Sequence, residues 1–76
     1  MTRTGTRPAG PSADLVTRQD MELLRLLAQG LPVCSVARRL RTSERTVRRR
    51  TRDICDRLGV GSAIQAVVWA ARRGML

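Results

Sequence analysis

The chain has 76 residues and a mass of 8.4 kDa, so it holds one small domain with a compact core. Its 15 arginines outnumber six acidic residues, which gives a formal net charge of +9, and it contains no histidine, lysine, tyrosine or phenylalanine. Without an imidazole to act as a base or a metal ligand, an enzyme is disfavoured and no cofactor or metal is expected, whereas the excess of cations favours a polyanionic partner.

Residues 1–14 contain two prolines, two glycines, three threonines and a serine, without a periodic apolar stripe. Such a composition cannot bury enough apolar surface to fold. We therefore expect residues 1–15 to form a disordered arm or a linker, and residues 16–76 to form the domain.

Two helices are predicted in the first half of the domain. The first is expected to begin at Thr17, where Asp20 three residues later completes a capping box, and to end before Gly30. The second is expected to follow Pro32, which suits the first turn of a helix, and to break at residues 41–42. Their apolar faces consist of Leu23, Leu24, Leu26 and Leu27 in the first helix and Val33, Val36, Ala37 and Leu40 in the second.

Two further helices are predicted in the second half. Ser43 is a good N-cap for a third helix over Glu44–Leu58. Ser62 and Gln65 form another capping box, which opens a fourth helix reaching Arg73, and a glycine follows each of these two helices. Because no segment alternates apolar and polar residues as a strand does, the sequence predicts an all-α domain of four helices with short connections.

The two cysteines, Cys34 and Cys55, are too few for a disulfide framework or for a structural zinc site, which usually takes four ligands. We expect both to be small buried apolar residues in a reducing compartment. A redox switch is the alternative, and no neighbouring residue supports it.

Arginines gather on one side of the third helix. At 100° per residue, Ile54 and Leu58 return to within about 20° of Val47, so these residues mark the buried stripe. About 100° to 200° from the stripe lies a contiguous cationic face, made of Arg45, Arg48, Arg49 and Arg52. A merely solvated face would mix the two signs of charge more evenly, so the pattern favours a helix in the major groove of DNA, with its N-terminal half facing the base edges.

The second helix, the turn and the basic third helix form a helix-turn-helix unit, in which the first helix crosses the DNA backbone and the second reads the groove. Arg50 lies at about 300° on the same wheel, beside the core stripe. Its stem is expected to pack there while its guanidinium reaches solvent or a phosphate, and we favour this role over base reading.

The fourth helix leaves almost no polar face, although a surface helix of a small domain needs only one apolar stripe. We expect Ala66, Val67 and Ala70 to face inward. The surplus favours a second contact surface, most simply with a two-fold partner, and tight packing within the monomer is the alternative. The expected homodimer interface consists of Ile64, Val68, Trp69 and Ala71.

Across the four expected helices the chain carries the motifs VTRQDMELLRLLAQGL, VARRL, SERTVRRR, RLGV and QAVVWAARRGML. In this register, residues 16–76 resemble the C-terminal DNA-binding domain of LuxR-type bacterial transcription regulators, also called the GerE or NarL/FixJ type. The resemblance implies a four-helix module that binds promoter DNA as a dimer and acts on transcription.

The resemblance also implies roles for single residues. The positions that look into the major groove are held by Arg48, Arg49 and Arg52. The positions near the start of the recognition helix that touch the phosphate backbone are held by Ser43, Arg45 and Thr46. Arg50, whose guanidinium is expected to reach a phosphate, is a fourth expected contact with the DNA backbone. The family's core positions are held by Ala37, Val47, Ile54, Leu58 and Val60.

We therefore predict sequence-specific binding of double-stranded DNA in the regulation of transcription, by a homodimer whose recognition helix is Glu44–Leu58. The alternative is a protein-interaction module that docks on RNA polymerase or a sigma factor, against which the row of arginines and the scarcity of acidic residues argue. RNA polymerase is a further partner if the protein activates transcription.

No run approaches the ~18 apolar residues of a membrane-spanning helix, and the first residues of the sequence lack the apolar run of a signal peptide. We expect a cytoplasmic, nucleoid-associated protein without a membrane partner. The first 15 residues are too few for a sensing domain, so no small-molecule ligand is expected within this chain.

Overall fold

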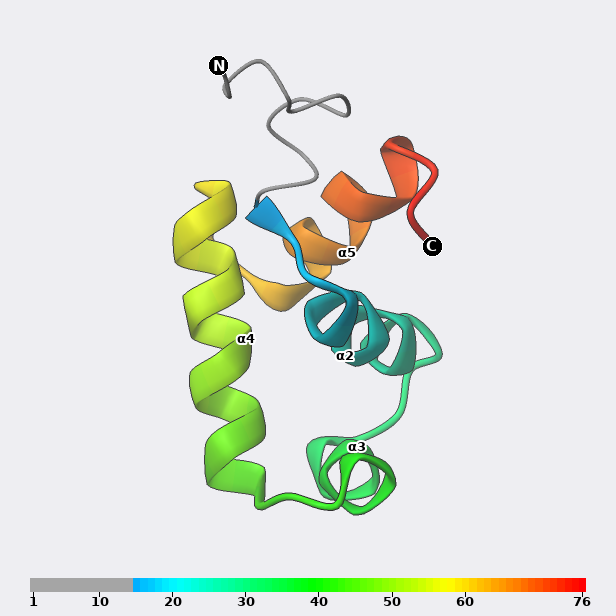
Figure 1. Cartoon of the computed structure of the whole chain (residues 1–76), viewed down its shortest axis with the longest axis vertical. Coiled ribbons are helices and arrows are strands. Elements are labelled where there is room, and N and C mark those ends of the chain that lie inside the picture. The colour runs from blue at the N-terminus through cyan, green and yellow to red at the C-terminus, as the bar shows by residue number, and fades with distance from the viewer. Residues whose placement is uncertain (1–14) are drawn as a thin grey trace, which may run out of the picture.

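The computed structural model describes residues 15–76, which contain four α-helices and no strand (Figure 1). The helices are α2 (Arg18–Ala28), α3 (Val33–Leu40), α4 (Glu44–Leu58) and α5 (Ala63–Arg72). The predicted all-α class and the four predicted helices are confirmed. The arm predicted over residues 1–15 lies, except for Leu15, outside the described residues.

The start of α2 is held by the predicted capping box. The Thr17 hydroxyl accepts a hydrogen bond from the Asp20 amide at 3.0 Å, and the Asp20 carboxylate accepts one from the Thr17 amide at 3.1 Å. Ser43 caps α4 in the same way, because its hydroxyl accepts from the Thr46 amide at 3.0 Å. Each of these caps satisfies backbone donors that the first helical turn leaves free.

Two helix starts differ in detail from the predictions. Pro32 is the N-cap of α3, with extended backbone angles (φ −67°, ψ 158°), and stands just before the first turn rather than inside it. At α5 the Ser62 hydroxyl accepts from the Gln65 amide at 3.3 Å, but the Gln65 side chain accepts from the Gly61 amide at 2.6 Å. The box is therefore half formed, because Gln65 reaches one residue further back than the N-cap.

The turn between α3 and α4 spans residues 41–43 and gives the helix-turn-helix its sharp bend. Arg41 adopts a left-handed conformation (φ 57°), which is unfavourable for a residue with a Cβ atom. The next residue stabilises the turn, because the Thr42 amide donates to the Ala37 carbonyl at 2.9 Å.

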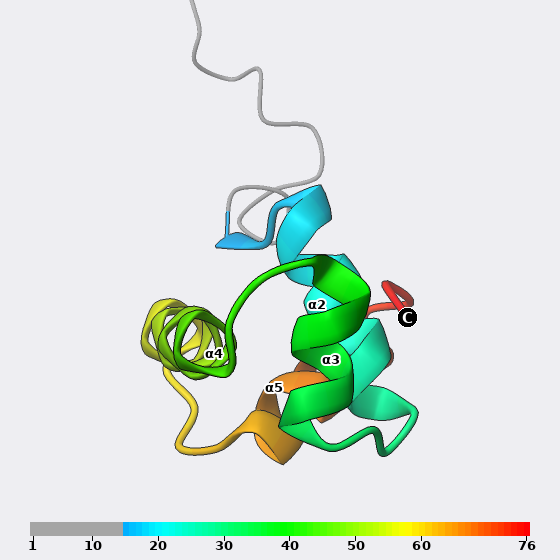
Figure 2. The same ribbon diagram turned by 90° about the horizontal axis from the view of Figure 1, so that it is seen from below.

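The core lies where the four helices meet. Its largest fully buried side chains are Leu23, Leu24, Val36, Val47 and Ile54. From α5 it receives Ala66 and Ala70, which are fully buried as predicted, while Val67 is half-buried. Seen from below in Figure 2, α4 stands along one side of the other helices, so only one of its faces contacts the core.

The prediction that both cysteines are buried is wrong for one of them. Cys55 on α4 is buried, but Cys34 on α3 is exposed. At 100° per residue, Cys34 lies about 160° from the fully buried Val36, on the opposite side of the short helix. Burial raises the pKa of the Cys55 thiol, and the negative charge of Asp56 adds to this effect.

Candidate nucleic-acid interface

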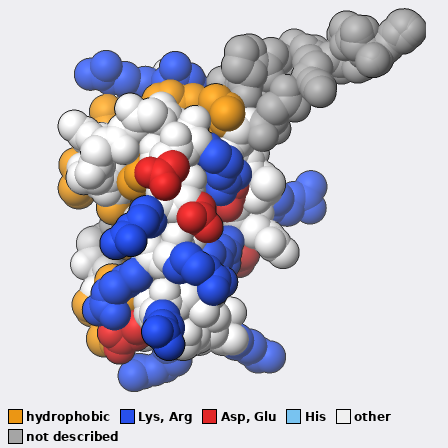
Figure 3. Space-filling model, turned by 90° about the vertical axis from the view of Figure 1, so that its left-hand side faces the viewer, with side chains coloured by type: hydrophobic (Ala, Val, Ile, Leu, Met, Phe, Trp, Pro, Cys, Tyr) orange, Lys and Arg blue, Asp and Glu red, His pale blue; other side chains and the backbone are white. Residues whose placement is uncertain are grey.

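The side of α4 that faces away from the core is a cationic surface, which we call the arginine face. It consists of Arg45, Arg48, Arg49 and Arg52, all of them exposed. Val47 and Ile54 on the opposite side of the helix are fully buried, as the helical period requires. Figure 3 views the molecule from the side on which α4 lies and shows arginine side chains gathered along it.

Within residues 15–76, only one member of the arginine face has a carboxylate within ion-pair distance. A guanidinium nitrogen of Arg48 lies 3.3 Å from Glu44 Oε1, and the two side chains are 65% and 47% exposed. An exposed pair of this spacing contributes only about 0.3–0.5 kcal/mol, so Arg48 exchanges it readily for another anion. The first turns of α4 therefore present positive charge that the described part of the fold does not neutralise.

The exposed side of α4 carries more acidic residues on its later turns than on its earlier ones. Asp53 and Asp56, also exposed, lie on the later turns of the helix, whereas the arginine face occupies the earlier ones. The positive end of the helix dipole adds to the charge at the N-terminus. An anion is consequently attracted to the N-terminal half of α4 more than to its C-terminal half.

Ser43 and Thr46, the two hydroxyl residues predicted to contact the DNA backbone, lie together at the start of α4. The Ser43 hydroxyl donates to Thr46 Oγ1 at 3.0 Å while it accepts from the Thr46 amide. Ser43 is exposed and Thr46 is half-buried. Both oxygens stand next to the arginine face, and their contact with a phosphate stays a prediction.

Arg50 leaves the arginine face, as its position on the wheel predicts. The residue is half-buried, and its Nη2 donates to the Gln19 carbonyl oxygen of α2 at 3.2 Å. Its stem thus runs beside the core while its guanidinium contacts a neighbouring helix. A phosphate contact by its remaining donors stays a prediction.

An ion pair behind α4, formed by a buried aspartate and an exposed arginine, was not predicted from the sequence. A guanidinium nitrogen of Arg57 lies 2.8 Å from the carboxylate of Asp20, a residue that is only 6% exposed. Burial by itself raises the pKa of Asp20, but hydrogen bonds from Arg57 and Thr17 and the charge of Arg57 outweigh it and hold the pKa below its ordinary value. The position of Arg57 on the same edge of α4 as Arg50 was a signal for such a role, but its partner is 37 residues away in the chain.

Comparison with known proteins agrees with this architecture. The family model for bacterial regulatory proteins of the luxR family (GerE) matches residues 14–70. The chain belongs to the luxR family. It therefore contains a helix-turn-helix DNA-binding domain of the kind found in transcription regulators. Domains of this family are generally not enzymatic.

Two relatives illustrate the match of the luxR-family domain. It is 35% identical over 54 residues to the nitrate/nitrite response regulator protein NarL of Escherichia coli K12, which covers 71% of this chain and 25% of that protein. It is 40% identical over 78 residues to the bialaphos biosynthetic pathway regulatory protein of Streptomyces hygroscopicus, which covers 100% of this chain and 30% of that protein. The chain thus spans less than a third of the length of these curated relatives. No solved structure matches it significantly.

The last helix of the luxR-family domain separates the four predicted interface residues into two groups. Ile64 is 71% exposed and Val68 is 42% exposed, and with the exposed Ala71 they lie along one edge of α5. Trp69 lies about 100° from Val68 and is half-buried, with the Arg73 guanidinium 3.9 Å from the centre of its ring. The apolar edge is thus Ile64, Val68 and Ala71, and its pairing with a second copy stays a prediction.

None of the helices among residues 15–76 is both long and apolar enough to cross a membrane.

Proposed function

We propose that this luxR-family domain binds double-stranded DNA sequence-specifically as a homodimer and thereby regulates transcription. In this proposal α4 lies in the major groove with its N-terminal half toward the base edges. The observation that carries the proposal is the arginine face, which is exposed and largely without carboxylate partners among the described residues.

The proposed roles follow from where the side chains stand. Arg48, Arg49 and Arg52 read bases, since a guanidinium can donate two hydrogen bonds to the O6 and N7 atoms of guanine. The contacts to phosphates are assigned to Ser43, Arg45, Thr46 and Arg50, three of which surround the start of α4. Because the phosphate contacts fix the register and the base contacts carry the sequence preference, both sets are needed.

The proposal extends to the setting in which the domain works. A homodimer presents two copies of α4, which matches a two-fold symmetric DNA site. The protein is then cytoplasmic and nucleoid-associated, and RNA polymerase becomes a further partner if the bound protein activates transcription.

The proposal is tested by selecting bound duplexes from a random pool, which gives the half-site, its spacing and its symmetry together. A salt titration on the selected duplex then measures the electrostatic share of binding. With about six phosphate contacts per dimer, the slope of log K against log salt is expected near −5. When arginines of the arginine face are replaced, the variant Arg25→Ala is the control for loss of net charge alone, because it removes an exposed arginine of α2.

If duplexes of every sequence fail to bind at low ionic strength, the proposal is wrong. Docking on RNA polymerase or a sigma factor is then the alternative to test.

A further inference from the structure

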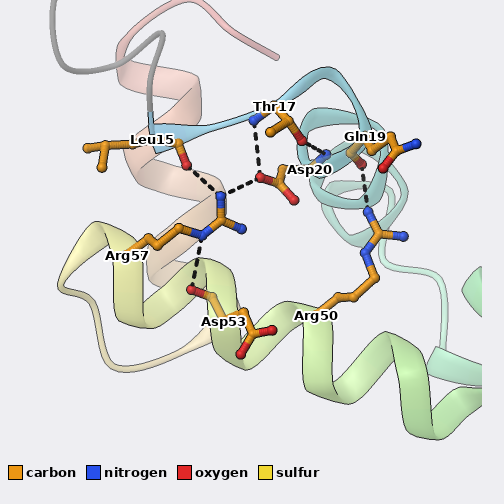
Figure 4. Close-up of polar contacts among 7 residues, drawn as sticks. All are labelled: Leu15, Thr17, Gln19, Asp20, Arg50, Asp53 and Arg57. Carbon is orange, nitrogen blue, oxygen red and sulfur yellow. Dashed lines mark hydrogen bonds and ion pairs between the residues drawn. The ribbon is translucent and has the colours of Figure 1, made fainter.

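Two arginines of α4 reach across to the first turn of α2 and to the residues just before it. Arg50 and Arg57 are seven residues apart, so they lie within about 20° of each other on one edge of the helix. Figure 4 shows both side chains extending toward residues 15–20. Arg50 donates to the Gln19 carbonyl at 3.2 Å, and Arg57 donates to the Leu15 carbonyl at 3.0 Å and pairs with Asp20 at 2.8 Å.

The Arg57 and Asp20 pair is the stronger of these two attachments. Asp20 is almost fully buried, and one of its carboxylate oxygens accepts from both the Thr17 amide and Arg57. Arg57 also donates from Nε to the Asp53 carbonyl of its own helix at 3.4 Å, which directs its guanidinium away from the arginine face. A charged hydrogen bond to a buried carboxylate is both stronger and more directional than an exposed ion pair.

Such bonds constrain a motion that the apolar core resists only weakly. The buried residues of α4 are Val47, Ile54 and Cys55, and apolar contacts such as theirs have no preferred direction. A helix held by such contacts alone has no bond that fixes its rotation about its own axis. Bonds at Arg50 and Arg57, which lie about 60° to 80° from Val47 on the side away from Cys55, oppose a roll of the helix because hydrogen bonds weaken steeply away from their preferred angle.

A roll of α4 would matter for reading bases. Side-chain tips lie about 5–6 Å from the axis of a helix, so a roll of about 20° moves them by about 2 Å. Binding constellations work only when their groups are held to within about 0.5 Å and 10–20°. The rotational setting of α4 therefore decides where the guanidiniums of the arginine face meet the base edges.

We propose that Arg57 and Asp20 are positioning residues that fix the rotation of α4 about its axis and so sharpen the discrimination between DNA sequences. Arg50 supplies the second point of attachment, and its remaining donors stay free for a phosphate. Neither Arg57 nor Asp20 touches a base in this proposal. The inference rests on the proposed function, because it assigns these residues a part in the same DNA reading.

The test compares two affinities for each variant. Dissociation constants are measured for the duplex selected by the unaltered protein and for the same duplex with one base pair of the half-site replaced. Arg57→Gln and Asp20→Asn are compared with the control Arg25→Gln, which removes one positive charge from the exposed surface of α2. The quantity compared is the ratio of the dissociation constant for the altered duplex to that for the selected duplex. A smaller folded fraction raises both constants by the same factor, so this ratio reports positioning and not stability.

We expect this ratio to fall about three- to tenfold for Arg57→Gln and Asp20→Asn. Such a fall is part of the discrimination that a single base pair normally provides in a specific site. The double variant is expected to lose no more than either single one, because both remove the same pair. Arg57→Lys keeps the charge next to Asp20 and is expected to retain more of the ratio than Arg57→Gln, and Asp20→Asn carries the test if Arg57→Gln does not fold. Arg25→Gln is expected to weaken both affinities and leave the ratio unchanged.

An unchanged ratio in both Asp20→Asn and the Arg57 variants overturns the inference and leaves the pair with a role in stability alone. If the unaltered protein binds no duplex, the proposed function is wrong and this inference is wrong with it. The two failures are distinguished by whether the unaltered protein binds.

Discussion

Replacing Ile64 by alanine tests the predicted homodimer at its most exposed large apolar residue. Ile64 is 71% exposed on the first turn of α5 and belongs to the apolar edge with Val68 and Ala71. Because little of it is buried within one copy, the substitution is expected to leave the fold intact. Alanine is also a better helix former than isoleucine, which favours α5 slightly in the variant.

The expected magnitude follows from the exposed fraction. The substitution removes three carbon atoms, each worth about 0.8 kcal/mol when fully buried, so with 71% exposure about 1.7 kcal/mol per copy is available to an interface. Two-fold symmetry doubles this to an upper value of about 3.4 kcal/mol per dimer. Incomplete burial at the interface lowers the expectation to about 2–3 kcal/mol, which is roughly a 30- to 150-fold weaker dimer.

Sedimentation equilibrium over a range of protein concentrations at fixed salt measures the dimer constant directly. Leu76→Ala provides the control, because Leu76 is also an exposed apolar residue, 38% exposed, but lies outside α5. We expect Ile64→Ala to weaken the dimer and Leu76→Ala to leave it unchanged. An unchanged dimer constant in both Ile64→Ala and Val68→Ala would refute the assignment of this edge, and a monomeric unaltered protein would refute the homodimer itself.

Three further outcomes are expected. Arg52→Ala is expected to cost about 1–3 kcal/mol on the selected duplex and to relax the base preference at one position, whereas an equal loss on all duplexes in fluorescence anisotropy would mean a phosphate contact. Because the pKa of Asp20 is lowered in the folded protein, its pair with Arg57 contributes stability above about pH 4 that is lost as the pH falls through the folded value. Because Arg57 is partly exposed, the free energies of unfolding of Asp20→Asn and the unaltered protein are expected to differ by only about 1–2 kcal/mol near pH 7. In thermal unfolding the two are expected to converge in acid, and a difference that stays constant with pH would contradict this linkage. Gly59→Ala is expected to lower the stability by about 1 kcal/mol in thermal melts, because Gly59 has a φ of +72°, which strains a residue with a Cβ atom. No other atom would crowd the added Cβ, so an unchanged melting temperature would contradict this backbone strain.

Much of the fold was readable from the sequence because helices are decided by neighbours along the chain. The caps at Thr17 and Ser43 depend on residues three positions apart, and the ends of α2 and α4 follow from the glycines after them, Gly30 and Gly59. The arginine face is equally local, since residue spacing and the helical period place its members on one side of α4. Both predictions needed only a helix that buries one stripe.

What the tertiary structure decided is which side chains from different helices meet. Arg57 contacts Leu15 and Asp20, and Arg73 covers one side of Trp69, away from the edge that Ile64 and Val68 share. The helical period says on which edge of its own helix each residue lies, but it says nothing about the angles at which two helices cross. Those angles result from the packing of the whole core, and they determine which carbonyl or carboxylate an arginine can reach.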